Sequence, residues 1–173
     1  MWGKVSNSGQ SRSSIEGILV HQTMVNKFTN MLSEKVNETF FLDDPLKDET
    51  NYGVINDPTQ ILNYNEIVND AISQGGVVTI GGYENTDENG LGRFYEPTII
   101  AKCHSGMRIQ MNQTFGPVLG IQAVDSPGEA AKIINSQRYN LESYLFSEDP
   151  FTIDQITMSL NVGTVHVLSL IHI

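Results

Sequence analysis

The stretch from Val118 to Asn135 reads VLGIQAVDSPGEAAKIIN and decides the fold class. Its first half, Val118 to Val124, is a short apolar run typical of a buried strand. Ser126 then stands directly before Pro127, the order in which a capping side chain and a first-turn proline open a helix. The stretch therefore predicts a strand followed at once by an amphipathic helix, which is the repeating unit of an α/β protein.

The same alternation continues on both sides of this stretch. Upstream, Val25, Phe28, Met31, Leu32 and Val36 recur at helical spacing. A second helix is expected from Pro58, capped by Asp57 and ended by Gly75-Gly76. Further strands are expected at residues 18–20, 77–80, 95–101, 141–146 and 164–167, with a last helix at 151–160. We predict an α/β fold, a three-layer arrangement with a largely parallel sheet flanked by helices, in one domain over residues 1–167.

A glycine-rich segment, Gly81 to Gly92, is expected to be an exposed loop. It follows a strand but opens no helix, so it lacks the helix N-terminus that holds a pyrophosphate. Cys103 and His104 are adjacent and would point to opposite faces of an extended segment. The remaining histidines have no ligand spacing, and no metal site is expected.

Composition excludes some classes of partner. The chain has 173 residues and a formal net charge of −10, which argues against nucleic acid and against an anionic membrane surface. No apolar run approaches the length of a membrane span. A single cysteine, Cys103, excludes an internal disulfide framework. We therefore expect a chain of the cytoplasm or of an organelle matrix.

Three segments, taken in order, resemble one enzyme family. They are NSGQSRSSIE at residues 7–16, GRFYEPT at 92–98 and QTFGPV at 113–118. Supporting matches are Asp44-Pro45-Leu46, Tyr52-Gly53, Gly81-Gly82 and residues 161–165. Together they resemble the catalytic domain of the aldehyde dehydrogenases over nearly all of residues 1–167. The resemblance implies oxidation of an aldehyde to a carboxylic acid with NAD or NADP, through a thioester on a cysteine thiolate.

The chain departs from the family at the residues that carry this reaction. The resemblance puts Arg12 at the position of the nucleophilic cysteine, and a guanidinium stays protonated and cannot form a thioester. Ser11, Ser13 and Ser14 are neighbours, but no base is placed to activate them. Gln113 stands where the family has the glutamate that binds the nicotinamide ribose, and a neutral amide makes a weaker contact. Phe115 remains available to pack beside the nicotinamide.

The resemblance also implies what this stretch of the family does not contain. The family's dinucleotide-binding domain, general-base glutamate and oxyanion-hole asparagine precede the segment at residues 7–16. We therefore expect a catalytic domain truncated at both ends that does not hold NAD or NADP productively by itself. Residues 168–173 match the translation of a sequencing adapter and are expected to be a non-native tail.

Three hypotheses of function follow. In the first, the chain is an aldehyde dehydrogenase fragment that is inactive alone. In the second, it is a non-catalytic interaction module that forms homo- or hetero-oligomers with intact relatives, favoured by the exposed sheet edge expected after Val167. In the third, Arg12, Gln113 and the C-terminal tail are sequence errors, which the surrounding nucleotide sequence would decide.

Overall fold

The computed structural model describes residues 2–41, 48, 50–86, 93–138 and 140–167. These residues form two compact units that divide between Ala123 and Val124. Several sequence predictions lie outside the described residues: the Asp44-Pro45-Leu46 match, the later part of the glycine-rich loop, and the tail at 168–173.

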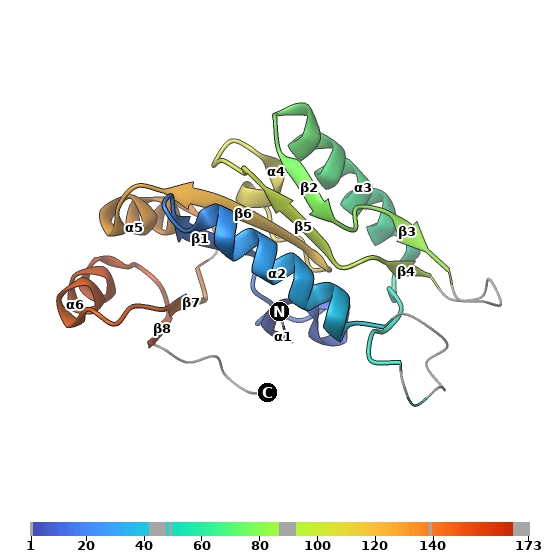
Figure 1. The fold of residues 1–173 in the computed structure, drawn as a ribbon, viewed down its shortest axis with the longest axis horizontal. Coiled ribbons are helices and arrows are strands. Elements are labelled where there is room, and N and C mark those ends of the chain that lie inside the picture. Colours follow the sequence, from blue (N-terminus) through green and yellow to red (C-terminus); the bar gives the residue numbers. More distant parts are fainter. Residues whose placement is uncertain (1, 42–47, 49, 87–92, 139, 168–173) are drawn as a thin grey trace. The chain divides into compact units, whose positions relative to one another are not determined.

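The first unit is built around a four-stranded sheet with the strand order β1-β6-β5-β2 (Figure 1). Its elements in chain order are α1 (Trp2–Val5), the turn η1 (Ser6–Gly9), β1 (Gly17–His21), α2 (Val25–Thr39), α3 (Pro58–Ser73), β2 (Val77–Ile80), β3 (Glu84–Asn85), β4 (Phe94–Tyr95), β5 (Thr98–Ala101), α4 (Arg108–Met111) and β6 (Val118–Val124). Strands β5 and β6 are parallel, and β2 pairs antiparallel with β5 at the edge of the sheet.

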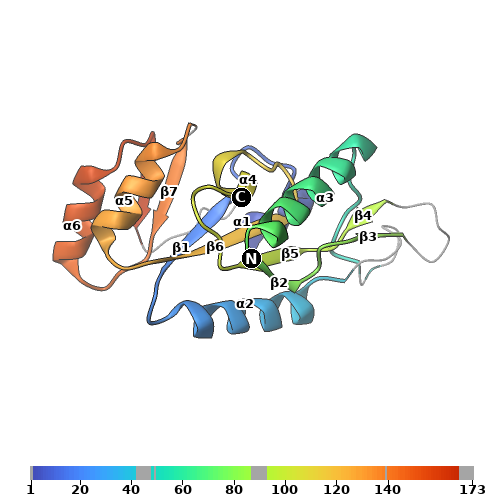
Figure 2. The ribbon, with the colours of Figure 1, turned by 90° about the horizontal axis from the view of Figure 1, so that it is seen from above.

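The sheet is covered by a helix on each side, α2 on one face and α3 on the other (Figure 2). Successive residues of β5 point to opposite faces, as a pleated strand requires. Ile99 packs in the cluster that contains Val36 of α2, and Ile100 packs in the cluster that contains Tyr64 of α3. The predicted three-layer α/β fold is therefore confirmed, with β2 as its antiparallel strand.

The two long helices follow the signals that the sequence carries. Helix α3 begins at Pro58, and the Asp57 carboxylate accepts a hydrogen bond from the backbone N–H of Thr59 at 2.9 Å. Helix α2 begins at Val25 and buries its Val36. No helix in the described part of the chain is long and apolar enough to cross a membrane.

Several short elements differ from the sequence predictions. The single strand expected at 95–101 is divided into β4 and β5 at Pro97, since proline has no N–H to donate to a ladder. The segment expected as a loop from Gly81 contains β3, which pairs antiparallel with β4. The short helices α1 and α4 and the turn η1 were not expected from the sequence, because four residues carry no periodicity.

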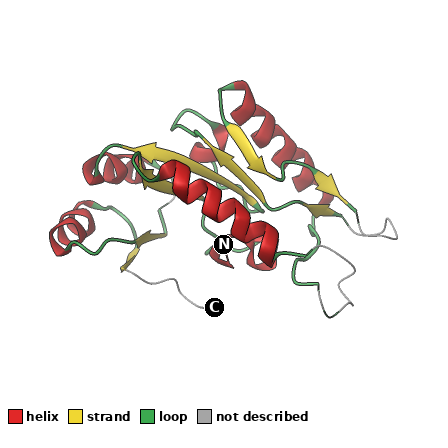
Figure 3. Cartoon of the chain, viewed as in Figure 1, coloured by secondary structure: helices red, strands yellow, loops and turns green. Residues whose placement is uncertain are grey.

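The second unit holds two helices and a two-stranded parallel sheet, drawn by type in Figure 3. Its elements are α5 (Pro127–Ser136), β7 (Glu142–Leu145), α6 (Pro150–Ser159) and β8 (Thr164–Val167). Both helices begin with a capping side chain followed by proline. Ser126 accepts from the N–H of Glu129 at 3.2 Å, and Asp149 accepts from the N–H of Thr152 at 3.1 Å.

Candidate active site

The loop that carries Arg12 begins with three consecutive residues in the left-handed region. Asn7, Ser8 and Gly9 have φ values of 52°, 55° and 73°. Ser8 is held there because its hydroxyl donates to the carbonyl oxygen of Gly53 at 2.6 Å. A side chain at Gly9 would place its Cβ 2.2 Å from the carbonyl oxygen of Gly116. The loop therefore lies directly against the segment at residues 113–117.

The segment at 113–117 is itself fixed by α3. The Tyr64 hydroxyl donates to the carbonyl oxygen of Phe115 at 2.8 Å, and Phe115 has a φ of 46°. Burial, followed by the charges of Glu16 and Asp57, raises the pKa of Tyr64 to about 12, so the hydroxyl stays protonated and continues to donate. Gly116 lies on the tyrosine ring, where a Cβ would be 2.2 Å from Cζ. The Tyr64 side chain thus restrains the backbone at residues 115–116.

Three side chains join the loop to the segment. The Glu16 carboxylate oxygen Oε2 accepts from the N–H of Thr114 at 2.8 Å and from its hydroxyl at 2.5 Å. The Lys4 ammonium donates to the Thr114 hydroxyl oxygen at 3.1 Å and lies 3.4 Å from the same Glu16 oxygen. Burial lowers the pKa of Lys4, and the Glu16 charge opposes that shift. Lys4 and Thr114 are buried and the Glu16 side chain is 27% exposed; we call these three residues the buried network.

The three residues expected at the site lie on these two joined segments. Arg12, Gln113 and Phe115 are all solvent-exposed. Arg12 lies between Gly9 and Glu16, the two loop residues that contact 113–117, while Gln113 and Phe115 flank Thr114. Within the described residues, the Arg12 guanidinium has no hydrogen-bond or ion-pair partner. The structure therefore brings the two segments together, with Arg12 exposed to solvent.

Among the described residues, the hydroxyls beside Arg12 are already hydrogen-bonded. The hydroxyls of Ser11 and Ser13 lie 3.2 Å apart and share a hydrogen bond, and Ser14 donates to the carbonyl oxygen of Lys4. Cys103 is buried in the core and its thiol donates to the carbonyl oxygen of Ile100. Burial raises the pKa of this thiol to about 11, which makes it a poor nucleophile at neutral pH.

The buried network was missed at the level of the sequence. Glu16 and Thr114 belong to the segments quoted for the resemblance, but nothing in those segments marks them as partners. Lys4 gave no signal at all, because a lysine is almost always exposed. A lysine with 1% of its surface exposed is recognisable only once the fold brings residues 4, 16 and 114 together.

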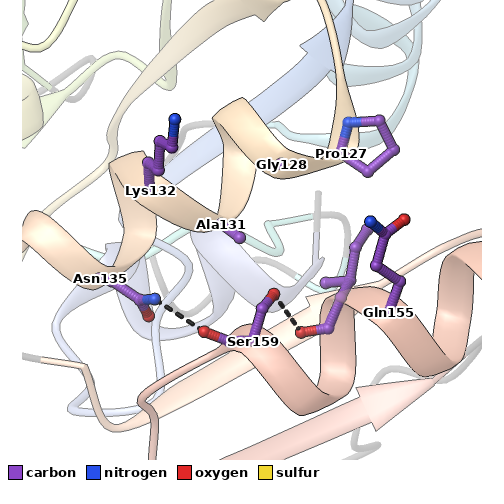
Figure 4. Close-up of a pocket in the computed structure, with 8 residues that line it drawn as sticks. Pro127, Gly128, Ala131, Lys132, Asn135, Gln155 and Ser159 are labelled. Atoms are coloured by element: carbon purple, nitrogen blue, oxygen red, sulfur yellow. Dashed lines mark hydrogen bonds between the residues drawn. The ribbon is translucent and has the colours of Figure 1, made fainter.

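The second unit holds a pocket between α5 and α6 with a volume of about 210 Å³ (Figure 4). Its wall includes Ala131 and Ile156, and the Asn135 amide crosses between the helices to donate to the carbonyl oxygen of Ser159 at 2.8 Å. The volume is below that of most ligand sites, about 300 Å³ or more. The pocket contains none of Arg12, Gln113 and Phe115. It carries no chemistry that bears on the candidate site.

Comparison with known proteins decides the family. A family model described as the aldehyde dehydrogenase family matches residues 1–170. The chain belongs to the aldehyde dehydrogenase family. Members of this family oxidise aldehydes with NAD(P).

Similar aldehyde dehydrogenases include a D-glyceraldehyde dehydrogenase (NADP(+)) of Picrophilus torridus, 30% identical over 96% of this chain and 34% of the relative. A succinate-semialdehyde dehydrogenase [NADP(+)] of Schizosaccharomyces pombe is 30% identical over 94% of this chain and 32% of the relative. The chain thus spans about a third of the length of the relatives it matches.

Solved aldehyde dehydrogenases have the same fold. One from Brucella melitensis biovar abortus 2308 superposes with a TM-score of 0.91 at 26% identity, covering 99% of this chain and 35% of the other. An indole-3-acetaldehyde dehydrogenase of P. syringae, solved in complex with NAD+, superposes with a TM-score of 0.88 at 26% identity, covering 96% and 33%. The fold of this chain is therefore that of one third of an aldehyde dehydrogenase.

Proposed function

We propose that this chain is part of an aldehyde dehydrogenase catalytic domain that is catalytically silent because Arg12 occupies the position of the nucleophile. One observation carries the proposal: the loop with Arg12 is bound to the segment of Gln113 and Phe115 through Gly9 and Glu16. This contact supports assigning the two motifs of the resemblance to one site.

The chemistry of the proposed site follows from the guanidinium. Thioester formation needs a sulfur lone pair that attacks the aldehyde carbon, and a protonated guanidinium has no such lone pair at neutral pH. The neighbouring hydroxyls bond to each other or to backbone, and within the described residues neither a histidine nor a carboxylate contacts Ser11 or Ser13. The aldehyde carbon would therefore meet no nucleophile.

The residues present fit only one end of NAD(P). Phe115, 41% exposed, and the exposed Gln113 are available to contact a nicotinamide and its ribose. Gly81 and Gly82 form no phosphate cradle, because Gly81 lies against the carbonyl oxygen of Pro97 and strand β3 follows. NAD(P), when bound in the family, accepts a hydride from the aldehyde carbon. We propose that the 173-residue chain does not hold it productively.

The purified chain is expected to produce no NADH or NADPH when supplied with NAD or NADP and simple aldehydes. The reason is the missing nucleophile, and the measurement is absorbance at the reduced nicotinamide band. An intact aldehyde dehydrogenase under the same conditions is the positive control. Aldehyde-dependent turnover by the purified chain would show that the site is not silent.

A second candidate function, association with intact relatives, is favoured by the second unit. Large apolar side chains are exposed on it, with Phe151 75% exposed and Met158 87% exposed, and Leu141 and Phe146 also exposed. Scattered apolar residues are ordinary on protein surfaces, but a unit of this size that exposes several large ones is suited to a partner. We propose a homo- or hetero-oligomer with another aldehyde dehydrogenase subunit.

Size-exclusion chromatography with light scattering tests the association. The chain is expected to run larger than its 19.2 kDa mass, or to co-elute with an intact relative. Exchanging Phe151 and Met158 for serine should return it to the monomer, because the apolar area lost is the area a partner would cover. A wild-type chain that stays monomeric with and without the relative would exclude this function.

The compartment is also a proposal. Cys103 is free and buried, and the sequence has no other cysteine. A chain that builds its core without disulfide bonds fits the reducing cytoplasm or an organelle matrix.

A further inference from the structure

We infer that Lys4 and Glu16 are positioning residues of the candidate site, which fix the backbone at Thr114 and thereby set where Gln113 and Phe115 stand relative to the loop of Arg12. The inference rests on the proposed function, because it concerns the same site. It adds two residues that neither the motifs nor the family reaction assign.

The first argument is the atom that Glu16 holds. The N–H of Thr114 belongs to the peptide group that joins Gln113 to Thr114, and its acceptor is Glu16 Oε2 at 2.8 Å. The same oxygen accepts from the Thr114 hydroxyl at 2.5 Å. Two donors from one residue on one oxygen fix both the position and the rotation of that peptide. On either side of Thr114 stand Gln113, expected to bind the nicotinamide ribose, and Phe115, expected to pack beside the nicotinamide.

The second argument is what holds Glu16. The Lys4 ammonium lies 3.4 Å from Glu16 Oε2 and 3.1 Å from the Thr114 hydroxyl oxygen, and 1% of Lys4 is exposed. The contact is too long for a short charge-assisted hydrogen bond, but the positive charge of the ammonium attracts the carboxylate and favours its orientation toward Thr114. The Ser14 hydroxyl donates to the Lys4 carbonyl oxygen at 3.2 Å, which joins α1 to the same loop. Residues 4, 14, 16 and 114 are therefore one connected arrangement.

The third argument separates positioning from plain stabilisation. The Lys4 side chain is buried and the Glu16 side chain is 27% exposed, so desolvation of the lysine offsets much of the attraction between the two charges. The other carboxylate oxygen, Glu16 Oε1, is buried and has no hydrogen-bond partner among the described residues. An unsatisfied buried acceptor costs free energy. The effect of the arrangement is to direct one carboxylate oxygen, Glu16 Oε2, toward Thr114.

Amide hydrogen exchange of Thr114, followed by NMR in the full chain, tests the inference directly. Glu16→Met keeps the length of the side chain and removes the acceptor, and it should speed exchange at Thr114 by about tenfold or more, as loss of a charge-assisted hydrogen bond implies. The amide resonances of Gln113 and Phe115 should shift with it. Glu16→Gln, which retains one acceptor oxygen, should give an intermediate rate. Amides of β5 and β6 should keep their rates.

Two further variants make the result decisive. Glu66→Met is the matched control, because it removes a carboxylate from another ion pair of the first unit, that with Arg108 at 3.0 Å, and it should leave Thr114 unchanged. The double variant Lys4→Met, Glu16→Met removes both charges. Its free energy of unfolding should be higher than that of Glu16→Met alone, while the Thr114 amide should still exchange fast.

Unchanged exchange at Thr114, or equal acceleration at every amide of the unit, would overturn the positioning role. Neither outcome depends on turnover. A wrong positioning role for Lys4 and Glu16 is therefore distinguishable from a wrong proposal that Arg12 prevents catalysis.

Discussion

Alanine at position 116 is expected to lower the free energy of unfolding by about 2–3 kcal/mol. A Cβ at Gly116 would lie 2.2 Å from Cζ and 2.4 Å from the hydroxyl oxygen of Tyr64. The tyrosine cannot move aside, because it is fully buried and its hydroxyl holds the carbonyl oxygen of Phe115. To relieve the clash, either the Tyr64 ring must move out of the core, or the segment at 113–117 must move away from the loop that carries Arg12.

Urea denaturation followed by circular dichroism measures this effect. Gly128→Ala is the matched control, because nothing lies within 4 Å of its Cβ and the residue stands inside α5. That change should raise stability by about 0.5–1 kcal/mol through the helix preference of alanine. A Gly116→Ala chain as stable as the wild type would show that the contact between α3 and this segment is not made in solution.

Much of the fold could be predicted because local signals and tertiary structure agree. Asp57 before Pro58 and Ser126 before Pro127 cap helices as expected. Ile99 and Ile100 of β5 pack in the cores on opposite faces of the sheet. Both faces are buried, so the apolar residues of β5 run continuously and do not alternate with polar residues. The division at Pro97, which separates β4 from β5, could have been anticipated from proline chemistry.

The candidate site could be predicted only in outline. The resemblance pointed to Arg12, Gln113 and Phe115, whose segments the structure joins. The residues that join them are separated along the chain, with Lys4 110 positions from Thr114. Such pairings depend on the register of η1 against residues 113–117, which left-handed residues such as Ser8 determine. Serine has no strong preference for that region, so no sequence signal marks the turn.

Arg12→Cys is expected to have the largest effect on activity when the chain forms part of an intact aldehyde dehydrogenase. Residues 2–167 would replace the corresponding third of an intact, active aldehyde dehydrogenase, once with Arg12 and once with Arg12→Cys. Loss of a nucleophile lowers turnover by about 10⁴-fold or more. The graft with cysteine should therefore exceed the graft with arginine by at least that factor.

The controls separate the nucleophile from other causes. Lys27→Cys adds an exposed thiol on α2 while Arg12 stays in place, and that graft should remain silent. Cys103 should contribute nothing, since its buried thiol has a pKa of about 11. Adding Gln113→Glu to Arg12→Cys should raise turnover further, because a carboxylate binds a ribose hydroxyl more strongly than an amide does. Binding of NAD(P) by each graft, followed by fluorescence, shows that the fold is retained.

The rate of NAD(P)H formation by this pair of grafts tests most directly the proposal that Arg12 at the nucleophile position prevents turnover. We predict no detectable turnover with Arg12 and clear turnover with Arg12→Cys. Turnover by the Arg12 graft at a rate within tenfold of the cysteine graft would contradict the assignment of Arg12 to the nucleophile position.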